Sequence, residues 1–358
     1  MSDTLKCTVC GGDLKFTPEL QLWKCEWCDK EHTEADLKGF TKEALDTLDK
    51  KVEVKATREE TEDGVVLTYK CSYCGAEVVA TEEVAQTFCV YCQRPITIMS
   101  QVSGEFRPEV VLPFKLVKEN ALEQFKNFLK GKRFLPNAYR ANQNIEKLTG
   151  VYIPFWMFDG TVHFDVSGEA DIITSSRQGD YQVTKTDTYR FVRAGSLGLK
   201  DIPVDASSKT PDDIMDSIEP FDFNELKPFA TPYLSGFLAE RYDVSRDESF
   251  IRAKKRMEGS ADNKVNASLT RYNRVRKGRD DKRTEGVKAR YGLLPVWMLN
   301  SRFQEKDYLF AMNGQTGKML GNLPIDKGKA AVFALIVFLC SGVGCALLGF
   351  LLRYFEVI

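Results

Sequence analysis

The longest apolar run of the chain lies at its C-terminal end. Residues Ala330 to Leu352 include no charged side chain, and Ser341 is their only hydroxyl. As a helix rising about 1.5 Å per residue, this run would be roughly 34 Å long, enough to cross a hydrocarbon core of about 30 Å. The pattern therefore predicts a transmembrane helix over 330–352 with a short tail at 353–358. The alternative is a buried helix of a soluble core.

Flanking charges give this helix an expected direction. Lys327 and Lys329 precede the run, whereas Arg353 follows it with Glu356 nearby. Basic residues favour the cytoplasmic side of a span, and no apolar run near Met1 has the pattern of a signal peptide. We therefore expect a single-pass protein of the cell membrane whose N-terminal body is cytoplasmic.

Mixed periodicities mark residues 108–326 as an α+β body. Residues 109–114 read as a strand, and 119–130 carry one apolar face at helical spacing. A second helix is predicted over 142–148, ending at Gly150, and the charged stretch 247–258 is a further helical candidate.

One strand pattern occurs twice in this body. Residues 151–158 read VYIPFWMF and residues 292–299 read GLLPVWML, which aligns Pro154 with Pro295 and Trp156 with Trp297. This echo predicts an internal duplication, with chance similarity of two buried strands as the alternative. The prolines indicate sheet edges or strand starts.

Antiparallel hairpins are expected after both copies of the pattern. Residues 161–174 and 184–194 alternate well enough to pair around the polar tract 175–180. After the second copy, 299–304 turns back through 307–312, and Asn313-Gly314 predicts a type I′ turn.

Eight of the ten cysteines form two sets with one spacing, C-x2-C-x14-C-x2-C. Two residues between cysteines let a tight turn aim both sulfurs at one ion, and two such turns complete a tetrahedral shell. We expect two structural Zn²⁺ sites without an open coordination position, with a positive φ at Gly11 and Gly75. The predicted ligands are Cys7, Cys10, Cys25 and Cys28 in the first site, and Cys71, Cys74, Cys89 and Cys92 in the second.

The zinc sites define two small β domains, ribbon 1 (1–36) and ribbon 2 (65–107). A charged helix and linker over 37–64 joins them, and its end from Arg58 is expected to be flexible. His32, directly after the last cysteine pair of ribbon 1, is expected at the surface.

Charge disfavours nucleic acid as the partner of the ribbons. The net charge is −6 over 1–64 and −1 over 65–107, whereas phosphate binding needs a basic face. The ribbon aromatics could stack on bases, but we expect them to pack around the metal or to contact a protein. They are Trp23, Trp27, Tyr73, Phe88 and Tyr91.

The body shows no catalytic constellation. His163 stands on a predicted strand without a suggestive partner. Residues 314–318 (GQTGK) resemble a phosphate loop only in part, because Met319 follows where Ser or Thr belongs. The aligned acids Asp165, Glu169 and Asp171 are expected on a solvated face. No catalytic and no cofactor-binding residue is predicted, and we expect no enzyme.

A basic stretch from Arg271 to Arg290 carries nine Lys/Arg against three Asp/Glu. Three interpretations stay open: a solvated charged helix and loop, contact with anionic lipid headgroups, or contact with nucleic acid.

The matched ribbons, the two P-x-W-M strands, residues 306–318 and the terminal span together resemble a bacterial family. Its members are double-zinc-ribbon membrane proteins labelled "TFIIB-type zinc ribbon" or "primosomal protein N′ (replication factor Y)-like". The helicase label does not fit this chain, which has no Walker A loop to grip ATP. The resemblance implies a place in envelope-stress modules beside phage-shock-protein-A-like, SPFH-type and TPM-domain proteins.

These patterns predict a multidomain chain of two zinc ribbons, an α+β body and one transmembrane helix. The expected function is that of a non-catalytic, tail-anchored adaptor whose ribbons recruit protein partners to the cytoplasmic membrane face. The alternative is a membrane-tethered, nucleic-acid-binding zinc ribbon protein linked to replication or transcription.

Overall fold

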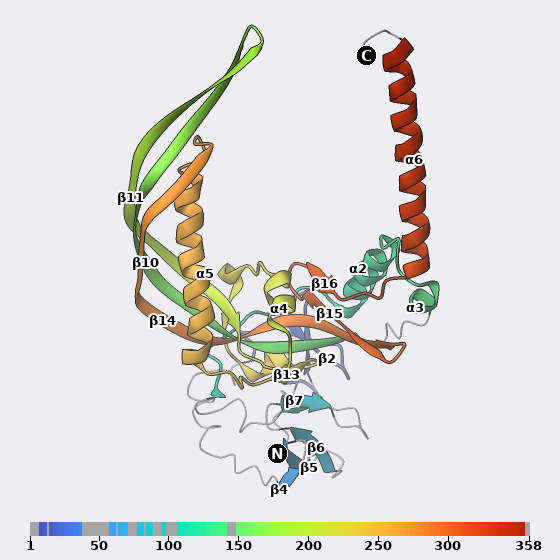
Figure 1. The fold of residues 1–358 in the computed structure, drawn as a ribbon. Coiled ribbons are helices and arrows are strands. Elements are labelled where there is room, and N and C mark those ends of the chain that lie inside the picture. The colour runs from blue at the N-terminus through green and yellow to red at the C-terminus, as the bar shows by residue number, and fades with distance from the viewer. Residues whose placement is uncertain are drawn as a thin grey trace.

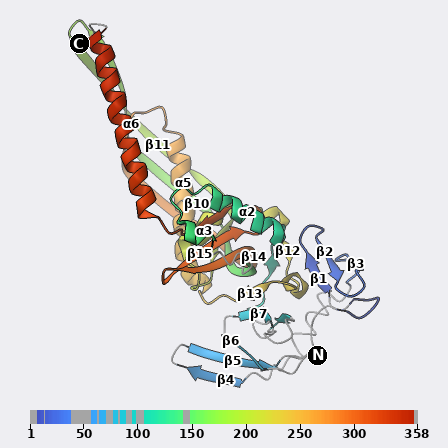
Figure 2. The ribbon, with the colours of Figure 1, turned by 90° about the vertical axis from the view of Figure 1, so that its right-hand side faces the viewer.

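The computed structural model describes residues 7–12, 14–37, 57–61, 64–70, 77–81, 84–88, 95–97, 106–141 and 148–354. A central body is built on one mixed sheet, and two long projections leave it in the same direction (Figure 1). One projection is the C-terminal helix, and the other is a ribbon of long strands. The small sheet that carries the first cysteines lies at the other end of the molecule (Figure 2).

The elements have the following bounds. The strands are β1 (Leu14–Thr17), β2 (Leu22–Cys25), β3 (Glu31–His32), β4 (Thr57–Thr61), β5 (Gly64–Lys70), β6 (Glu77–Thr81), β7 (Val84–Phe88), β8 (Pro95–Thr97), β9 (Val110–Val111), β10 (Thr149–Gln178), β11 (Tyr181–Asp205), β12 (Lys227–Pro228), β13 (Leu238–Glu240), β14 (Arg274–Phe303), β15 (Lys306–Asn313) and β16 (Met319–Gly321). The helices are α2 (Lys118–Lys130), α3 (Asn137–Ala141), α4 (Asp212–Ile218), the 3-10 helices η5 (Phe223–Glu225) and η6 (Thr231–Leu234), α5 (Arg246–Ala267) and α6 (Lys327–Tyr354).

The main sheet has the order β12-β9-β14-β10-β13-β7-β8, with β11 on β10, β15 on β14 and β16 on β15. Its centre is the antiparallel pair β10–β14, which runs from Thr149↔Met298 to Asp171↔Arg274. Strands β7 and β8, from the predicted ribbon 2, continue this sheet through β13. The predicted helices at 119–130 and 247–258 are confirmed as α2 and as the first half of α5.

The two P-x-W-M segments make matching contacts. The indole N–H of Trp156 donates to the carbonyl of Val244 at 3.1 Å, and that of Trp297 donates to the carbonyl of Leu116 at 3.0 Å. Each accepting residue lies between a short parallel strand and a helix. That strand is β13 on β10 in the first case and β9 on β14 in the second.

The two prolines also have equivalent surroundings, and these contradict the prediction that they mark sheet edges. The Pro154 carbonyl accepts a hydrogen bond from the backbone of Ala206 at 2.9 Å, and the Pro295 carbonyl accepts one from Gly314 at 2.8 Å. Both prolines lie inside the sheet, where a short parallel neighbour gives way to an antiparallel one. A residue without an N–H is tolerated there because no strand pairs with it continuously on that side.

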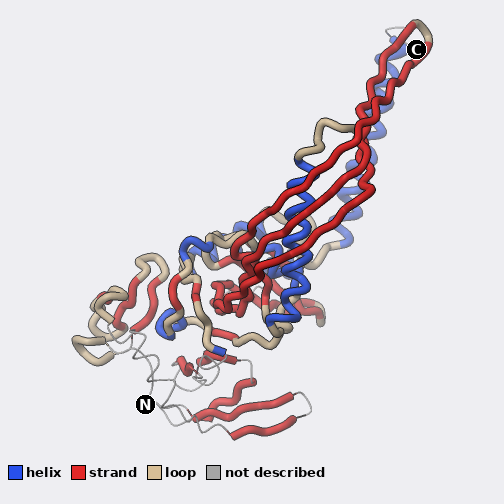
Figure 3. The backbone as a smooth tube through the Cα atoms, turned by 90° about the vertical axis from the view of Figure 1, so that its left-hand side faces the viewer, coloured by secondary structure: helices blue, strands red, loops and turns tan. Residues whose placement is uncertain are grey.

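The second projection, here called the β blade, consists of residues 160–178, 181–199 and 274–289 of β10, β11 and β14 (Figure 3). The predicted hairpin is confirmed, but β10 and β11 pair as far as Gln178↔Tyr181, so its connection is shorter than the predicted tract 175–180. The turn is only Gly179-Asp180, and Gly179 has φ +63°. Helix α5 covers one face of the blade with small and apolar residues that pack on the strands. Ala253, Met257, Ala261 and Val265 of α5 pack against Val162, Val166 and Ala170 of β10.

The basic stretch is strand β14 rather than a helix and loop, and acids of the blade and of α5 neutralise much of it. Ion pairs join Arg276 to Asp171 at 2.7 Å and Lys277 to Asp262 at 2.8 Å. Further pairs are Arg279–Asp165, Lys282–Asp262, Lys282–Asp280, Arg283–Glu285 and Arg290–Asp201.

Asp171 also departs from its expected place on a solvated face, because it is buried. It accepts hydrogen bonds from Arg276 and from Thr188, which lower the pKa of its carboxyl. Alternation along one strand could not reveal this, because the groups that contact Asp171 come from the neighbouring strands β11 and β14.

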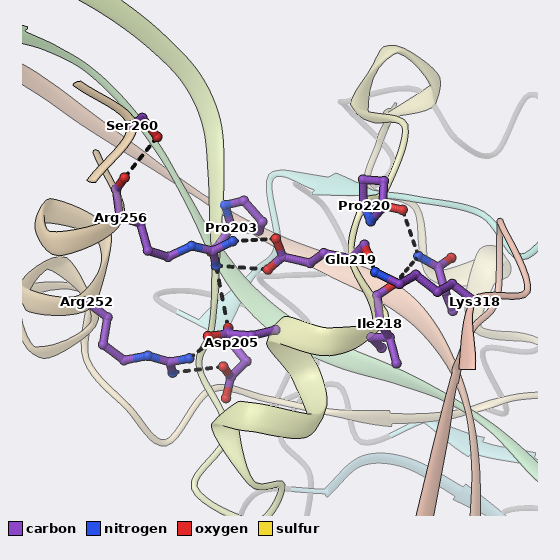
Figure 4. A network of polar contacts seen from close by, with 11 residues as sticks. Pro203, Asp205, Ile218, Glu219, Pro220, Arg252, Arg256, Ser260 and Lys318 are labelled. Carbon is purple, nitrogen blue, oxygen red and sulfur yellow. Dashed lines mark hydrogen bonds and ion pairs between the residues drawn. The ribbon is translucent and has the colours of Figure 1, made fainter. Parts of the chain in front are cut away.

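A polar network ties α5 to the base of the blade (Figure 4). Arg252 pairs with Asp205 at 2.9 Å and with Asp216 at 3.0 Å, and Arg256 pairs with Glu219. Burial raises the pKa of Asp205 to about 6, against the lowering effect of Arg252.

The GQTGK stretch forms part of a structural turn between β15 and β16. The Asn313 side-chain amide donates to the Pro220 carbonyl at 3.1 Å, and the Lys318 amine donates to the Glu219 carbonyl. The predicted type I′ turn at Asn313-Gly314 is wrong, because Gly317 carries the positive φ of +77°. Gly314 instead provides space, since a Cβ there would lie 2.6 Å from the Phe114 ring.

Two other predictions meet different structure. Gly150 lies inside β10 rather than at a helix end, and residues 142–147 of that predicted helix lie outside the described residues. The tract from Arg58, expected to be flexible, enters β4 of the three-stranded sheet β4-β5-β6.

Candidate metal centre and membrane helix

Four thiols converge in the small sheet β1-β2-β3. The Sγ atoms of Cys7, Cys10, Cys25 and Cys28 all lie within 4.8 Å of one another. The Cys7–Cys28 and Cys10–Cys25 separations are 3.7 and 3.4 Å. Tetrahedral zinc with bonds of about 2.3 Å needs sulfurs roughly 3.8 Å apart. The spacing of these sulfurs therefore fits a metal ion of that size.

Two equivalent turns build this cluster. In the first, Gly11 N–H donates to the Cys7 carbonyl at 2.9 Å, and Val9 N–H donates to the Cys7 sulfur at 3.4 Å. In the second, Asp29 and Trp27 make the same two bonds to Cys25, at 3.1 and 3.4 Å. The predicted positive φ of Gly11 is confirmed at +72°. Gly75 lies outside the described residues.

The electrostatics of the four sulfurs favour a bound cation. Burial would raise the pKa of Cys7, but N–H donors from Cys10 and Val9 together with His32 lower it to about 6. At Cys10 a backbone N–H of Gly12 lowers the pKa, yet the neighbouring sulfurs raise it to about 12. Four thiolates this close repel one another, and a dication offsets that repulsion.

His32 corrects an expectation of the sequence analysis. It is buried rather than at the surface, because β3 pairs with β2 and brings His32 opposite Trp23. Its Nε2 lies 3.2 Å from the Cys7 sulfur. An imidazole N–H at this distance can donate to a metal-bound thiolate and orient it. The only sequence signal for this position of His32 was its place shortly after the last cysteine of ribbon 1.

The second set of ligands lies outside the described residues. Cys71 and Cys74 fall in the connection between β5 and β6, and Cys89 and Cys92 fall in the connection between β7 and β8. Both connections therefore join antiparallel strands, which is the arrangement that the hairpin pattern of a ribbon predicts.

Ribbon 1 is fastened to the body by one of its faces. Trp23 is 1% exposed and packs against Phe16 and Tyr233, with ring centroids 5.2 and 5.1 Å away. Its indole N–H donates to the Pro232 carbonyl at 3.1 Å, and the Gln21 amide donates to the body's Phe114 carbonyl at 2.8 Å. The sequence offered no sign of this docking, because the contact joins residues about 200 positions apart.

The opposite face of ribbon 1 carries exposed apolar side chains. Val9 and Trp27 are the third residues of the two C-x-x-C turns and are 68% and 66% exposed. Trp27 lies over the backbone at Gly12, where an added Cβ would be 2.9 Å from the indole. The surface formed by Val9 and Trp27 is here called the knuckle face.

Helix α6 contains a stretch that could span a membrane. Residues Lys327–Leu347 have a mean hydropathy of 2.5, and their most apolar window is 0% buried. No other helix in the described parts of the chain is as long and as apolar. The alternative of a buried core helix is therefore wrong. Neither this burial nor the hydropathy sets the direction in which α6 crosses.

His163 lies on the β blade and is half exposed, with Nε2 3.7 Å from a Glu285 carboxylate. They border an open, mostly charged hollow with Arg279 and Lys282. The acids of this hollow pair with its bases: Asp165 and Asp281 with Arg279, Asp280 with Lys282, and Glu285 with Arg283.

Comparison with known proteins places the chain in a family. No protein-family model matches it, and no solved structure matches it. A chain of Bacillus subtilis (strain 168) described as "Uncharacterized protein YdjG" is 36% identical over 236 residues, which cover 66% of the present chain and 69% of YdjG. Identity at this level over this share of both chains establishes common descent, and the chain therefore belongs to the same family as Bacillus subtilis YdjG.

Proposed function

We propose that the protein is a non-catalytic, tail-anchored adaptor that uses zinc ribbons to hold partner proteins at the cytoplasmic face of the cell membrane. Zinc would occupy the four thiols of ribbon 1 and, by the shared spacing, those of ribbon 2. A closed four-thiolate shell stabilises a fold and leaves no position for substrate.

The observation that carries the proposal is the division of ribbon 1 into two faces. The body covers the Phe16 and Trp23 face, while the metal turns hold Val9 and Trp27 in solvent. Exposed tryptophans are favoured anchors at protein interfaces. Since Trp27 is fixed between two metal ligands, its ordering cost on binding is small.

Charge supports a protein rather than a nucleic acid as the partner. Residues 1–64 carry a net charge of −6, which opposes phosphate. The basic stretch of β14 is extensively paired with carboxylates. A membrane-tethered nucleic-acid binder remains the alternative, and a salt-dependent gel shift by the full chain would favour it.

The resemblance to double-zinc-ribbon membrane proteins suggests partner classes. They are phage-shock-protein-A-like, SPFH-type and TPM-domain proteins of envelope-stress modules. We also propose that the body arose by internal duplication, since each P-x-W-M strand has a short parallel neighbour, an indole hydrogen bond and a following antiparallel strand.

The experiment is affinity purification of the full chain from detergent-solubilised membranes, followed by mass spectrometry. A Val9→Ser/Trp27→Ala variant is expected to lose at least tenfold of a specific partner, because the anchor of the knuckle face is gone. The matched control is Tyr181→Ala, which removes a 78% exposed aromatic at the blade tip. Equal recovery of every partner from wild type and the ribbon variant would rule the proposal out.

A further inference from the structure

The first turns of α6 are fastened to the loop between α2 and α3. The Lys329 amine donates to the Leu135 carbonyl at 2.7 Å, and Asp326 N–H donates to the Phe134 carbonyl at 2.8 Å. The rings of Phe134 and Phe333 meet edge to face, with centroids 5.3 Å apart. This loop therefore lies at the level where the apolar helix begins.

The loop brings cations to that level. Lys130, Lys132 and Arg133 are exposed there, beside the exposed Lys327 of α6. Within the described parts of the chain, no carboxylate forms an ion pair with any of these four. Asp326 caps α6 instead, since its Oδ1 accepts a hydrogen bond from Lys329 N–H at 3.1 Å.

A hollow of about 330 Å³ lies between this loop and residues 323–325. Its lining is largely apolar (Phe134, Leu135, Leu323, Pro324 and Ile325) and also includes Lys132 and Arg133. Ile325 is 69% exposed directly before the helix. The basic side chains could bind the phosphate group of a phospholipid, and the apolar side chains could contact the upper part of an acyl chain.

We propose that residues 130–135 and 322–327, here called the juxtamembrane collar, bind an anionic phospholipid where α6 enters the bilayer. This proposal rests on the proposed membrane anchorage by α6. A basic residue near an anionic membrane surface adds about fivefold to affinity, equivalent to about 1 kcal/mol. Two such residues add roughly thirtyfold.

The collar differs from the basic stretch Arg271 to Arg290, for which the sequence left lipid contact open as one of three interpretations. Those residues lie on β14, where Asp171, Asp262 and Asp280 pair with several of them. The collar cations are few, and none of them forms an ion pair within the described residues, although the Lys132 amine lies 4.2 Å from the centroid of the Phe128 ring. They also add to Lys327 on the same side of the span, which strengthens the positive-inside argument for a cytoplasmic body.

The test is a titration of the detergent-solubilised full chain with phosphatidylglycerol or phosphatidylcholine, with bound lipids counted by native mass spectrometry. Wild type is expected to prefer phosphatidylglycerol at least tenfold. Lys132→Glu/Arg133→Glu is expected to lower affinity for phosphatidylglycerol by about thirtyfold or more and to leave phosphatidylcholine unchanged. Ile325→Ser is expected to weaken both lipids equally.

The matched control is Arg274→Glu/Lys288→Glu, which reverses two cations of β14. An equal loss of preference in the control, or no loss in the collar variant, would overturn the proposal. Membrane fractionation of the same variants separates this failure from that of the anchor. If wild type itself is absent from membranes, the proposed anchorage fails, whereas a membrane-bound protein without lipid preference refutes the collar alone.

Discussion

Ribbon 1 and α6 both carry large apolar side chains, but the body buries those of ribbon 1 and leaves those of α6 exposed. In ribbon 1, Phe16 and Trp23 are almost fully buried against Tyr233. In α6, side chains such as Leu335 and Phe338 are 57% and 73% exposed. The fold therefore buries the Phe16 and Trp23 face of ribbon 1 and leaves the apolar surface of α6 exposed. An apolar helix that its own fold leaves bare is suited to lipid, whereas ribbon 1 keeps only its knuckle face for a partner.

Removing α6 should have the largest effect. A chain that ends at Asp326 is expected to leave the membrane fraction completely, because nothing else in the described chain is apolar enough to span. Its thermal unfolding should stay within a few degrees of wild type, since only the first turns of α6 contact the body. Fractionation and calorimetry test both parts, and a truncated chain that remains in carbonate-washed membranes would contradict the comparison.

The next prediction concerns the two projections, which leave the body in the same direction (Figure 1). Charged blade residues such as Arg279 and Lys282 cannot enter hydrocarbon. In a bilayer, the blade is therefore expected to lie outside the hydrocarbon that α6 crosses. Spin labels at Ser176 and Val343 in reconstituted protein should be accessible to a water-soluble and a lipid-soluble relaxant, respectively. Lipid accessibility at both sites would refute this prediction.

Two tryptophans of one ribbon give a matched pair. Trp23→Ala is expected to lower the free energy of unfolding of the docked ribbon by about 3–5 kcal/mol, as for large buried aromatics. Trp27→Ala should change it by about 0.5 kcal/mol or less, because Trp27 is exposed. Hydrogen exchange of β1 and β2 in the full chain measures both, and equal protection in the two variants would show that ribbon 1 is not docked.

A smaller effect is expected at the base of the blade. Arg252→Ala should lower the free energy of unfolding by about 1–3 kcal/mol, because the Asp205 carboxylate is left buried without its cation. The pKa of Asp205 is about 6 in the fold and about 4 when unfolded, so its contribution to stability falls as pH rises between those values.

Without Arg252, the pKa of Asp205 rises further. The decrease in the free energy of unfolding with rising pH should therefore extend above pH 6. Urea unfolding from pH 5 to 8 tests this, with Asp205→Asn as the control that removes the titrating group. A difference between wild type and Arg252→Ala that does not grow with pH would contradict the account.

Local patterns predicted local features well. The C-x2-C spacing predicted which thiols of ribbon 1 converge. Helical periodicity predicted α2, and the long apolar run without charges predicted α6. The echo around Trp156 and Trp297 predicted two strands with matching contacts. The partners of the two indoles nonetheless lie 88 and 181 positions away in the sequence.

Long-range pairing was not predictable in the same way. The burial of Asp171 depends on Thr188 and Arg276 of the neighbouring strands, the docking of Trp23 depends on η6, and the collar forms because α6 returns to the α2–α3 loop. The turn at Gly317 and the interior positions of Pro154 and Pro295 likewise depend on which strands become neighbours. None of these contacts leaves a periodic trace in the sequence.

The most direct test of the metal-held ribbon is zinc-edge X-ray absorption of the membrane-purified full chain. The variant to use has Cys71, Cys74, Cys89 and Cys92 replaced by serine, so that only the first site contributes. We predict about one zinc per chain with four sulfur ligands at roughly 2.3 Å, and an unchanged shell in His32→Ala. A chain without zinc, or a shell in which nitrogen replaces one sulfur, would contradict a four-cysteine zinc site in ribbon 1.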